Sequence, residues 1–368
     1  MTADSSDVTP QFNELAFYTL AGAPRSPRDL IGEVQMGEEL GFGSMFISER
    51  FNIKEAATLS GAAGAVSQRM GIATAATNHN TRHPMVTAAY AMTMHKMTAG
   101  RFSLGLGRGI GPMFDAYGLP RITTRQIEDF VGVMRRLWRG QAIIRHDGPC
   151  GSYPLLSLGR EYDEHIPMTF TAFGPNSLAL GGRAFDAVVL HTFFTEETTR
   201  RCVSAVKTAA EQAGRNPDHV KVWSCFATIG DHLPEALRLK KLVGRMATYL
   251  QAYGDLMVKT NNWDPAILER FRADDFVRNF RGAIDGLATT EELEHVAELI
   301  PNSWLQSAAT GSPASCATSI NQQFDMGCDG VILHGASPTE LAPIVEAYRG
   351  QRKAGAHGHM TVNPGGIS

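Results

Sequence analysis

An acidic residue stands directly after one of the short apolar runs of this sequence. Glu49 follows the run at residues 44–48, and a carboxylate there could act as a general acid or base, or accept a hydrogen bond from a cofactor. The competing interpretation is an ion pair with Arg50 or Arg108. We favour the functional interpretation, because in a barrel of parallel strands the chemistry gathers where the strands end.

The next polar loop holds Asn78, His79 and His83, after the run at residues 71–76. A histidine there could exchange a proton with a substrate hydroxyl or carbonyl, although a loop histidine paired with backbone is an equally good interpretation. Metal binding is not expected in this loop, because no carboxylate joins these residues at a ligand spacing and the H-E-x-x-H pattern is absent. His79 is therefore a second candidate proton-transfer group.

A glycine-rich stretch follows the run at residues 102–106. Gly107, Arg108 and Gly109 leave room for backbone to approach a flat or phosphorylated ligand. The stretch is not interpreted as a dinucleotide-binding loop, because no helix pattern begins directly after Gly109 and Pro112 intervenes. A strand narrowed for tight packing in the barrel is the alternative.

The ends of three further predicted strands also carry candidate ligand-binding residues. Phe173, Gly174 and Pro175 precede a predicted helix, whose first amides could receive a phosphate; an ordinary strand-to-helix turn is equally compatible. His191 and His334 each end an apolar run and could be either ligands or structural histidines.

The elements that must position these residues alternate between short apolar runs and helical periodicity, which predicts parallel strands with crossover helices. The predicted strands are residues 15–20, 44–48, 71–76, 102–106, 167–172, 187–191, 220–229 and 330–334. The predicted helices are residues 27–40, 55–67, 84–97, 123–138, 176–184, 195–213, 234–250 and 339–348. Eight strand–helix pairs in this order predict a (β/α)8 TIM barrel.

Two stretches exceed a minimal barrel and are predicted to be insertions of a single domain that cap its mouth. They are residues 139–165, rich in Gly and Pro, and residues 251–313, helical in pattern. A separate small helical domain at 251–313 is the alternative, although no Gly/Ser linker isolates it. The glycine-rich tail, residues 354–368, is expected to be flexible.

Composition excludes several classes of partner. Lys and Arg number 34 against 37 Asp and Glu, a net charge of −3, so nucleic acid and anionic membranes are not expected. The five cysteines are scattered without C-x-x-C spacing, which favours reduced thiols. The N-terminal stretch has no signal-peptide pattern and no apolar run reaches the ~20 residues of a membrane span. A cytoplasmic protein is therefore expected.

The ordered motifs resemble the bacterial luciferase-like monooxygenase superfamily, whose members use flavin mononucleotide (FMN) or the deazaflavin coenzyme F420. The similarity extends over most of the chain. The segments that carry it are residues 38–51, 77–84, 100–109, 172–175, 181–190 and 327–333.

The resemblance implies a cofactor lying across the mouth of the barrel, with a non-proline cis peptide within residues 74–78 pressed against its ring. It places Gly107, Arg108 and Gly109 along the cofactor side chain, the Phe173 turn near its phosphate, and Glu49 beside the ring. The implied cofactor-binding residues are Glu49, Thr74, Ala75, Ala76, Thr77, Asn78, Gly107, Arg108, Gly109, Phe173, Gly174 and Pro175.

The sequence also departs from the family pattern. Arg50 stands where relatives frequently have histidine, and Ile110 stands where the sugar-phosphate dehydrogenases have glutamate. A lysine that would hold a substrate phosphate is missing from residues 192–198, so a sugar phosphate is a poor candidate substrate.

By resemblance, the expected function is hydride transfer between F420 and an alcohol, carbonyl or activated double bond of a small molecule, with Glu49 and His79 as proton-transfer groups. An FMN monooxygenase with a reductase partner is the first alternative, and a non-catalytic cofactor-binding barrel the second. A homodimer is expected because relatives commonly dimerise.

Overall fold

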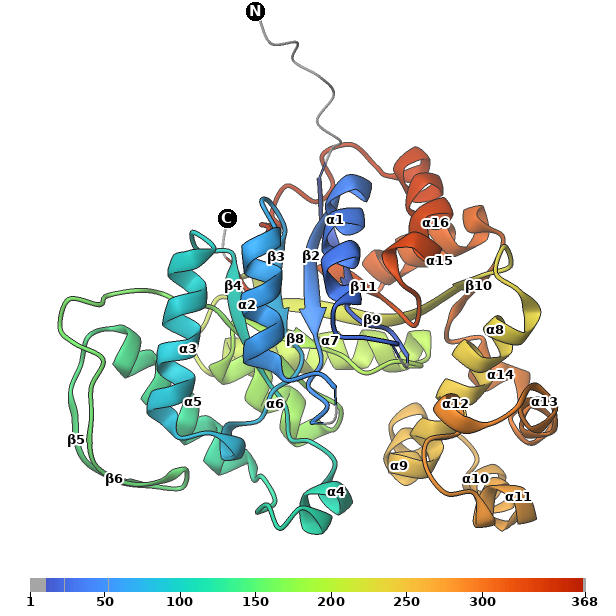
Figure 1. Cartoon of the computed structure of the whole chain (residues 1–368), viewed down its shortest axis with the longest axis horizontal. Coiled ribbons are helices and arrows are strands. Elements are labelled where there is room, and N and C mark those ends of the chain that lie inside the picture. Colours follow the sequence, from blue (N-terminus) through green and yellow to red (C-terminus); the bar gives the residue numbers. More distant parts are fainter. Residues whose placement is uncertain (1–10, 23, 52, 367–368) are drawn as a thin grey trace, which may run out of the picture.

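The computed structural model describes residues 11–22, 24–51 and 53–366 (Figure 1). In these residues eight parallel strands close into a barrel, since β8 pairs with β9, β9 with β11 and β11 with β1. The barrel strands are β1 (Phe12–Tyr18), β2 (Phe42–Ile47), β3 (Gly71–Thr74), β4 (Phe102–Leu106), β7 (Met168–Thr171), β8 (Ala187–Val189), β9 (Lys221–Gly230) and β11 (Gly330–His334). The predicted (β/α)8 barrel is confirmed, and each predicted strand overlaps an observed one.

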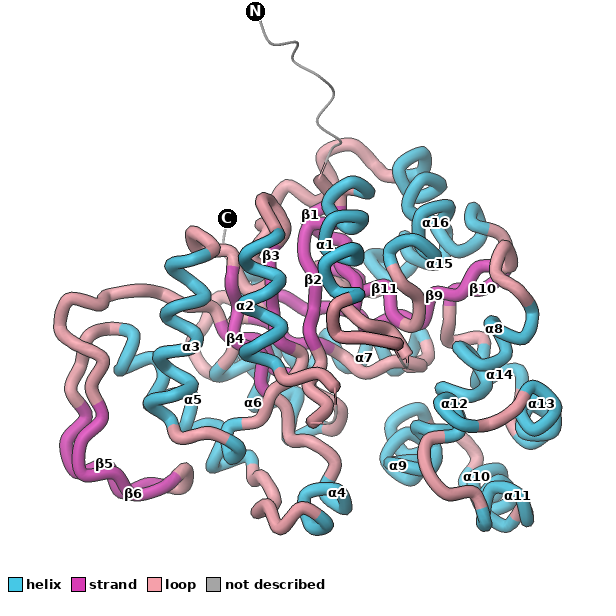
Figure 2. Tube along the Cα trace, in the orientation of Figure 1, coloured by secondary structure: helices cyan, strands magenta, loops and turns pink. Residues whose placement is uncertain are grey.

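Helices surround the barrel, one main helix after each strand (Figure 2). They are α1 (Asp29–Leu40), α2 (Ala56–Val66), α3 (Pro84–Met97), α5 (Thr124–Trp138), α6 (Pro175–Ala184), α7 (Glu196–Gln212), α15 (Pro313–Asp325) and α16 (Pro338–Gln351). The helix predicted at 234–250 is not the barrel helix that follows β9. That role belongs to α15, which packs on β9, β11 and α16.

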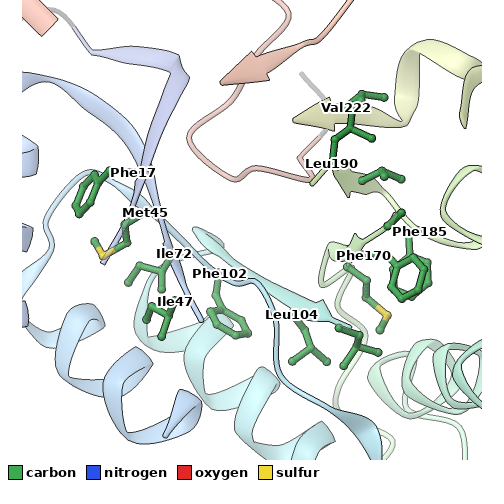
Figure 3. Close-up of a cluster of buried hydrophobic side chains, with 14 of the residues drawn as sticks. Phe17, Met45, Ile47, Ile72, Phe102, Leu104, Phe170, Phe185, Leu190 and Val222 are labelled. Carbon is green, nitrogen blue, oxygen red and sulfur yellow. The ribbon is translucent and has the colours of Figure 1, made fainter. Parts of the chain in front are cut away.

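The strands alternate their side chains between the barrel interior and the helices. In β1, Ala16 and Tyr18 join the cluster inside the barrel, whereas Leu15 and Phe17 join the larger cluster between strands and helices. Figure 3 shows part of this larger cluster, with Phe17 among its labelled side chains. Because both faces of the strands are buried, the strands appear in the sequence as continuous apolar runs.

A helical insertion follows β9 and begins earlier than predicted. Its elements are α8 (Glu235–Leu239), a π-helical turn (Lys240–Gly244), α9 (Arg245–Asn261), α10 (Pro265–Ala273), α11 (Asp275–Asn279), α12 (Ile284–Leu287), α13 (Thr290–Leu299) and α14 (Asn302–Leu305). They share a hydrophobic cluster in which Trp263 stacks on Trp304 at 4.3 Å between ring centroids. Strand β10 (Ala309–Gly311) then pairs with the end of β9 and returns the chain to the barrel.

The segment 139–165 forms an antiparallel hairpin of β5 (Ile143–Gly148) and β6 (Gly151–Leu156). The hairpin lies beside α5 at the edge of the molecule (Figure 1). None of its residues lines the cavity at the barrel mouth that is described below. It therefore does not cover that cavity in the way the sequence suggested.

The end of the chain packs against the N-terminal ends of the strands. The Trp223 Nε1–H donates to the Pro364 carbonyl at 2.9 Å, and Asn363 Nδ2 donates to the carbonyls of Gly100 and Phe102 at 2.8 and 2.9 Å. Met360 is buried in the interior cluster. Residues 360–366 are thus docked on the barrel, where they supply partners for backbone groups that would otherwise be buried unpaired. Flexibility of the tail stays a prediction.

The structure was also searched for membrane spans. None of the helices in the described part of the chain is both long and apolar enough to cross a bilayer.

The docked tail should contribute measurably to stability. Asn363→Ala removes both donors from the Gly100 and Phe102 carbonyls, so we expect the free energy of unfolding to fall by about 1–3 kcal/mol. Guanidinium unfolding followed by circular dichroism measures this change. Asn302→Ala, at an exposed position, is the control and should change it by less than about 0.5 kcal/mol. Equal effects of the two variants would contradict the docking role.

Candidate active site

A cavity of about 280 Å³ opens at the C-terminal ends of the strands. It is enclosed by strand ends on one side and by the first turns of α9, within the helical insertion, on the other. Its lining residues are Tyr18, Thr19, Ala21, Gly22, Ser48, Arg50, Lys54, Ala75, Ala76, Ile110, Thr171, Leu190, His191, Thr192, Cys225, Arg245, Tyr249, Tyr253 and His334. The position agrees with the end of a TIM barrel at which chemistry is expected.

The backbone after β3 forms one wall of this cavity. The peptide bond between Ala75 and Ala76 is cis, although neither residue is proline, which confirms the cis bond predicted within residues 74–78. A β-carbon at Gly107 would lie 2.7 Å from the β-carbon of Ala76. Glycine at position 107 is therefore what lets this bulge sit against β4.

A buried charge network holds the bulge from behind. Glu49 accepts hydrogen bonds from Thr77 Oγ1 at 2.7 Å and from Arg82, and Arg82 also pairs with Glu55. The Glu49 backbone N–H donates to the Ala76 carbonyl at 3.3 Å. Arg82, rather than Arg50 or Arg108, is thus the cation that pairs with Glu49. The Glu49 side chain is not among the cavity-lining residues.

His79 lies behind the same loop. Its ring packs 5.4 Å from the ring of Phe130 in α5, and its Nδ1 has no hydrogen-bond partner among the described residues. Burial lowers the pKa of His79 to about 4. The side chain does not line the cavity either, and the proton-transfer roles of His79 and Glu49 stay predictions.

Asn78 and Arg108, which were predicted to bind the cofactor, donate hydrogen bonds to backbone carbonyls of the protein. Asn78 Nδ2 donates to the Gly107 carbonyl at 2.8 Å, and Arg108 Nη2 donates to the Ile122 carbonyl at 3.1 Å. Gly109 has a φ of +66°. The helix α4 (Gly111–Ala116) begins two residues later, so the expectation that no helix starts here is wrong. Pro112 is compatible with that helix because it lies in its first turn.

The turn after β7 is joined to the cavity through an aromatic stack. The Phe173 ring lies parallel to that of His191, with 4.2 Å between centroids and 3° between planes. Gly174 is the N-cap of α6 and Pro175 its first residue. The amides at the start of α6 have no side-chain cap from Gly174, which leaves this helix end able to receive an anionic group.

The hydrogen bonds of His191 define its tautomer. Nδ1 lies 2.9 Å from the Thr192 carbonyl, which can only accept, so Nδ1 carries the hydrogen. Burial lowers the pKa of His191 to about 4, so the ring is neutral near pH 7. Its Nε2 then accepts from the Tyr253 hydroxyl at 3.1 Å. Burial also raises the pKa of Tyr253 well above its usual range, which keeps this phenol protonated.

Two polar atoms face this region without a partner among the described residues. They are Thr171 Oγ1 and His334 Nδ1, both buried and both on cavity-lining residues. Burial, followed by the charge of Arg245, lowers the pKa of His334 well below its usual range. Because buried polar groups are normally paired, these two atoms indicate that the cavity accommodates a polar ligand.

Three cationic side chains also line the cavity. Lys54 is almost fully buried and donates to the carbonyls of Thr19 and Leu20, and burial together with the nearby charge of Arg50 lowers its pKa to about 7. Arg245 pairs with Asp285 at 2.7 Å, whereas Arg50 donates to the Gly22 carbonyl at 3.3 Å. Of the three, Arg50 is exposed and Arg245 is balanced by Asp285, so the positive charge at the cavity comes mainly from Arg50.

The sequence matches the profile of the luciferase-like monooxygenase family over residues 11–330. The chain belongs to this family. It is 22% identical over 305 residues to the 5,10-methylenetetrahydromethanopterin reductase of Methanolobus tindarius, which spans 81% of this chain and 87% of the relative. It is 26% identical over 185 residues to the F420-dependent glucose-6-phosphate dehydrogenase of Beutenbergia cavernae, which spans 47% of this chain and 55% of that protein.

A solved structure of the coenzyme F420 dependent tetrahydromethanopterin reductase from Methanopyrus kandleri superposes with a TM-score of 0.75 at 16% identity. The superposition covers 92% of this chain and 99% of that chain. At this level of identity the similarity shows the fold, and it agrees with the barrel of the luciferase-like family.

Sequence reasoning missed the part of the site that the insertion supplies. Tyr249 and Tyr253 are four residues apart in α9, and Arg245 stands one turn earlier. Although α9 is kinked at Tyr253, the three share one face, since Arg245 lies 5.7 Å from the Tyr249 ring centroid and the Tyr249 and Tyr253 rings stack at 5.5 Å. The spacing was visible, but the luciferase-like motifs lie elsewhere in the chain and gave no reason to choose this face over the other helix faces of the insertion.

The burial of His79 predicts an acid-sensitive contribution to stability. Its pKa is about 4 in the folded chain against ~6.5 when unfolded, so the unfolded state takes up a proton first as the pH falls. The free energy of unfolding should therefore decline between about pH 6.5 and 4. His79→Leu should remove roughly 2–3 kcal/mol of this decline, as measured by urea titrations across that range.

The exposed His359 provides the control, and His359→Leu should alter the decline little. A full decline in the His79→Leu variant would show that burial of His79 is not its source.

Proposed function

We propose that this protein is an F420-dependent oxidoreductase that moves a hydride between the deazaflavin and an alcohol, carbonyl or activated double bond of a small organic substrate. The wall of small residues at Ala75 and Ala76, for which Gly107 leaves room, carries the proposal, since the resemblance places the cofactor ring against this segment. The F420-dependent relative and the methanopterin reductases support it.

The residues present fit such a cofactor. Ala75 and Ala76, with Gly107 behind them, form a wall without large side chains, where a flat ring system can approach the backbone. The unpaired Thr171 Oγ1 offers a polar partner at the same wall. The uncapped start of α6, at Gly174, would hold an anionic part of the cofactor. When bound, the deazaflavin supplies hydride transfer, while the protein supplies orientation.

On the opposite side of the cavity, Tyr253 and His191 would handle the proton at the substrate oxygen. The neutral His191 fixes the Tyr253 hydroxyl through Nε2, and the raised pKa keeps the proton on the phenol oxygen. The phenol has a single hydrogen, which it donates to His191 Nε2, so its oxygen can accept from a substrate hydroxyl. It can donate to a substrate carbonyl when the O–H turns from His191 to the substrate. The Arg50 and Lys54 side chains at the same cavity favour a substrate or cofactor group that is negatively charged.

The first test is cofactor binding. Titration of the purified protein with F420, followed by cofactor fluorescence, should show saturable binding. Gly107→Ala should weaken that binding at least tenfold, because the new β-carbon would collide with Ala76 and displace the bulge. Gly61→Ala is the matched control, since a β-carbon at Gly61 in α2 meets nothing within 4 Å. Turnover of a panel of carbonyl compounds with reduced F420 should proceed without oxygen.

The alternatives appear as other outcomes of the same experiments. Binding of FMN without binding of F420, with product formation that requires oxygen, would replace the proposal with a monooxygenase. Binding of neither cofactor would contradict both enzyme assignments and favour a non-catalytic barrel.

The second test concerns the phenol. Tyr253→Phe should lower kcat about 100-fold, within the range expected for loss of a positioned proton donor, and leave F420 affinity within a few-fold of the parent. The exposed Tyr117 supplies the control, as Tyr117→Phe should leave kcat unchanged. If Tyr253→Phe turns over normally, the proton comes from another group.

A further inference from the structure

A cysteine, a histidine and an aspartate meet on the outer surface of the barrel, far from the cavity. His146 and Cys150 lie at the tip of the β5–β6 hairpin, and Asp129 projects from α5. His146 Nε2 lies 3.0 Å from Asp129 Oδ2 and 3.6 Å from Cys150 Sγ. One ligand atom from each of the three residues lies within 4.8 Å of the other two.

We propose that Asp129, His146 and Cys150 form a binding site for a divalent transition metal ion, with Zn²⁺ as the best match. Thiolate, imidazole and carboxylate are the three ligand types that zinc uses in proteins. Bond lengths of about 2.3 Å to sulfur and about 2.0–2.1 Å to nitrogen, at tetrahedral angles, separate the two ligand atoms by roughly 3.6 Å. The observed separation of Cys150 Sγ and His146 Nε2 is 3.6 Å. The 3.0 Å between His146 Nε2 and Asp129 Oδ2 would widen to about 3.4 Å when both bind the ion.

The hairpin tip is shaped so that these groups can meet. A β-carbon at Gly148 would lie 2.5 Å from Asp129 Oδ2 and 2.7 Å from His146 Nε2, so glycine is needed for their approach. The Tyr153 hydroxyl donates to the Cys150 carbonyl at 2.8 Å, and the Tyr153 ring stacks on that of His146. Tyr153 thus holds both hairpin ligands in position from behind.

The position of the thiol distinguishes a metal site from a simple docking contact. Hairpin docking is already achieved by the His146–Asp129 pair and by the Cys150 backbone N–H, which donates to Asp129 Oδ2 at 3.0 Å. Neither contact requires a cysteine side chain. A metal site does require it, because the Cys150 sulfur supplies the third ligand.

The surroundings leave room for a fourth ligand. Asp129 and His146 border a surface hollow of about 410 Å³ that also touches Glu128. Glu128 is held by Arg183 through two hydrogen bonds of 2.7 Å. Water from the hollow is therefore the expected fourth ligand, and the ion would join the hairpin to α5.

Metal titration of the full-length protein tests the site. Zn²⁺ should bind with one-to-one stoichiometry in calorimetry and raise the unfolding temperature by several degrees. Co²⁺ as a probe should give a sulfur-to-cobalt charge-transfer band. Cys150→Ala keeps the backbone bond to Asp129, so the hairpin stays docked, yet it should abolish the band and weaken Zn²⁺ binding at least 100-fold. Ser152→Ala, on the same hairpin, is the control and should bind Zn²⁺ within threefold of the parent.

Each result decides the proposal in a definite way. Absence of one-to-one binding, or equally tight binding by the Cys150→Ala variant, would overturn it. Because the cluster shares no residue with the cavity, F420 binding should be unaffected in the Cys150→Ala variant. Failure of the metal site is therefore distinguishable from failure of the proposed function.

Discussion

The requirement that buried backbone groups be paired determines the shape of the cavity wall. The chain leaves β3 at Thr74, and the bulge that follows must find its partners in the neighbouring strands. The Ala75 N–H donates to the Ile47 carbonyl at 2.8 Å on one side, and the Thr77 N–H donates to the Gly105 carbonyl at 3.0 Å on the other. A β-carbon at Gly105 would lie 1.6 Å from the Thr74 carbonyl oxygen. Gly105 in β4, and Gly107 directly after it, are therefore a consequence of this close approach.

The charged residues beside the bulge, Glu49 and Arg82, hold it in place. Glu49 connects Thr77 to Arg82, and its side chain is almost fully shielded from solvent. Breaking a buried pair by removing one partner is costly because it strands the other charge. Glu49 thus braces the bulge in this structure, and its proton-transfer role stays a prediction. The neutral groups His191 and Tyr253 line the cavity beside the three cationic side chains. Neutral groups need no permanent counter-ion in a buried site.

How far the sequence predicts the fold depends on whether a signal is local. The barrel strands were recognisable because burial on both faces makes each of them a continuous apolar run. Helix α15 (Pro313–Asp325) was missed because its small and polar residues, beginning Pro313–Ala314–Ser315, give a weak apolar pattern. The docking of Asn363 on Gly100 was not predictable either, since contacts across most of the chain length leave no mark on neighbouring residues.

The two sides of the candidate site also differ in how local their sequence signals are. The family motifs located the wall formed by Ala75, Ala76 and Gly107, because a backbone that approaches a ligand demands small residues in a fixed order. The opposite side comes from α9, where Tyr249 and Tyr253 depend on how an insertion folds back over the mouth. A cofactor shared by a family needs a constant wall, whereas substrates differ between members. With the proposed function, we therefore expect the insertion to determine which substrate this cavity selects.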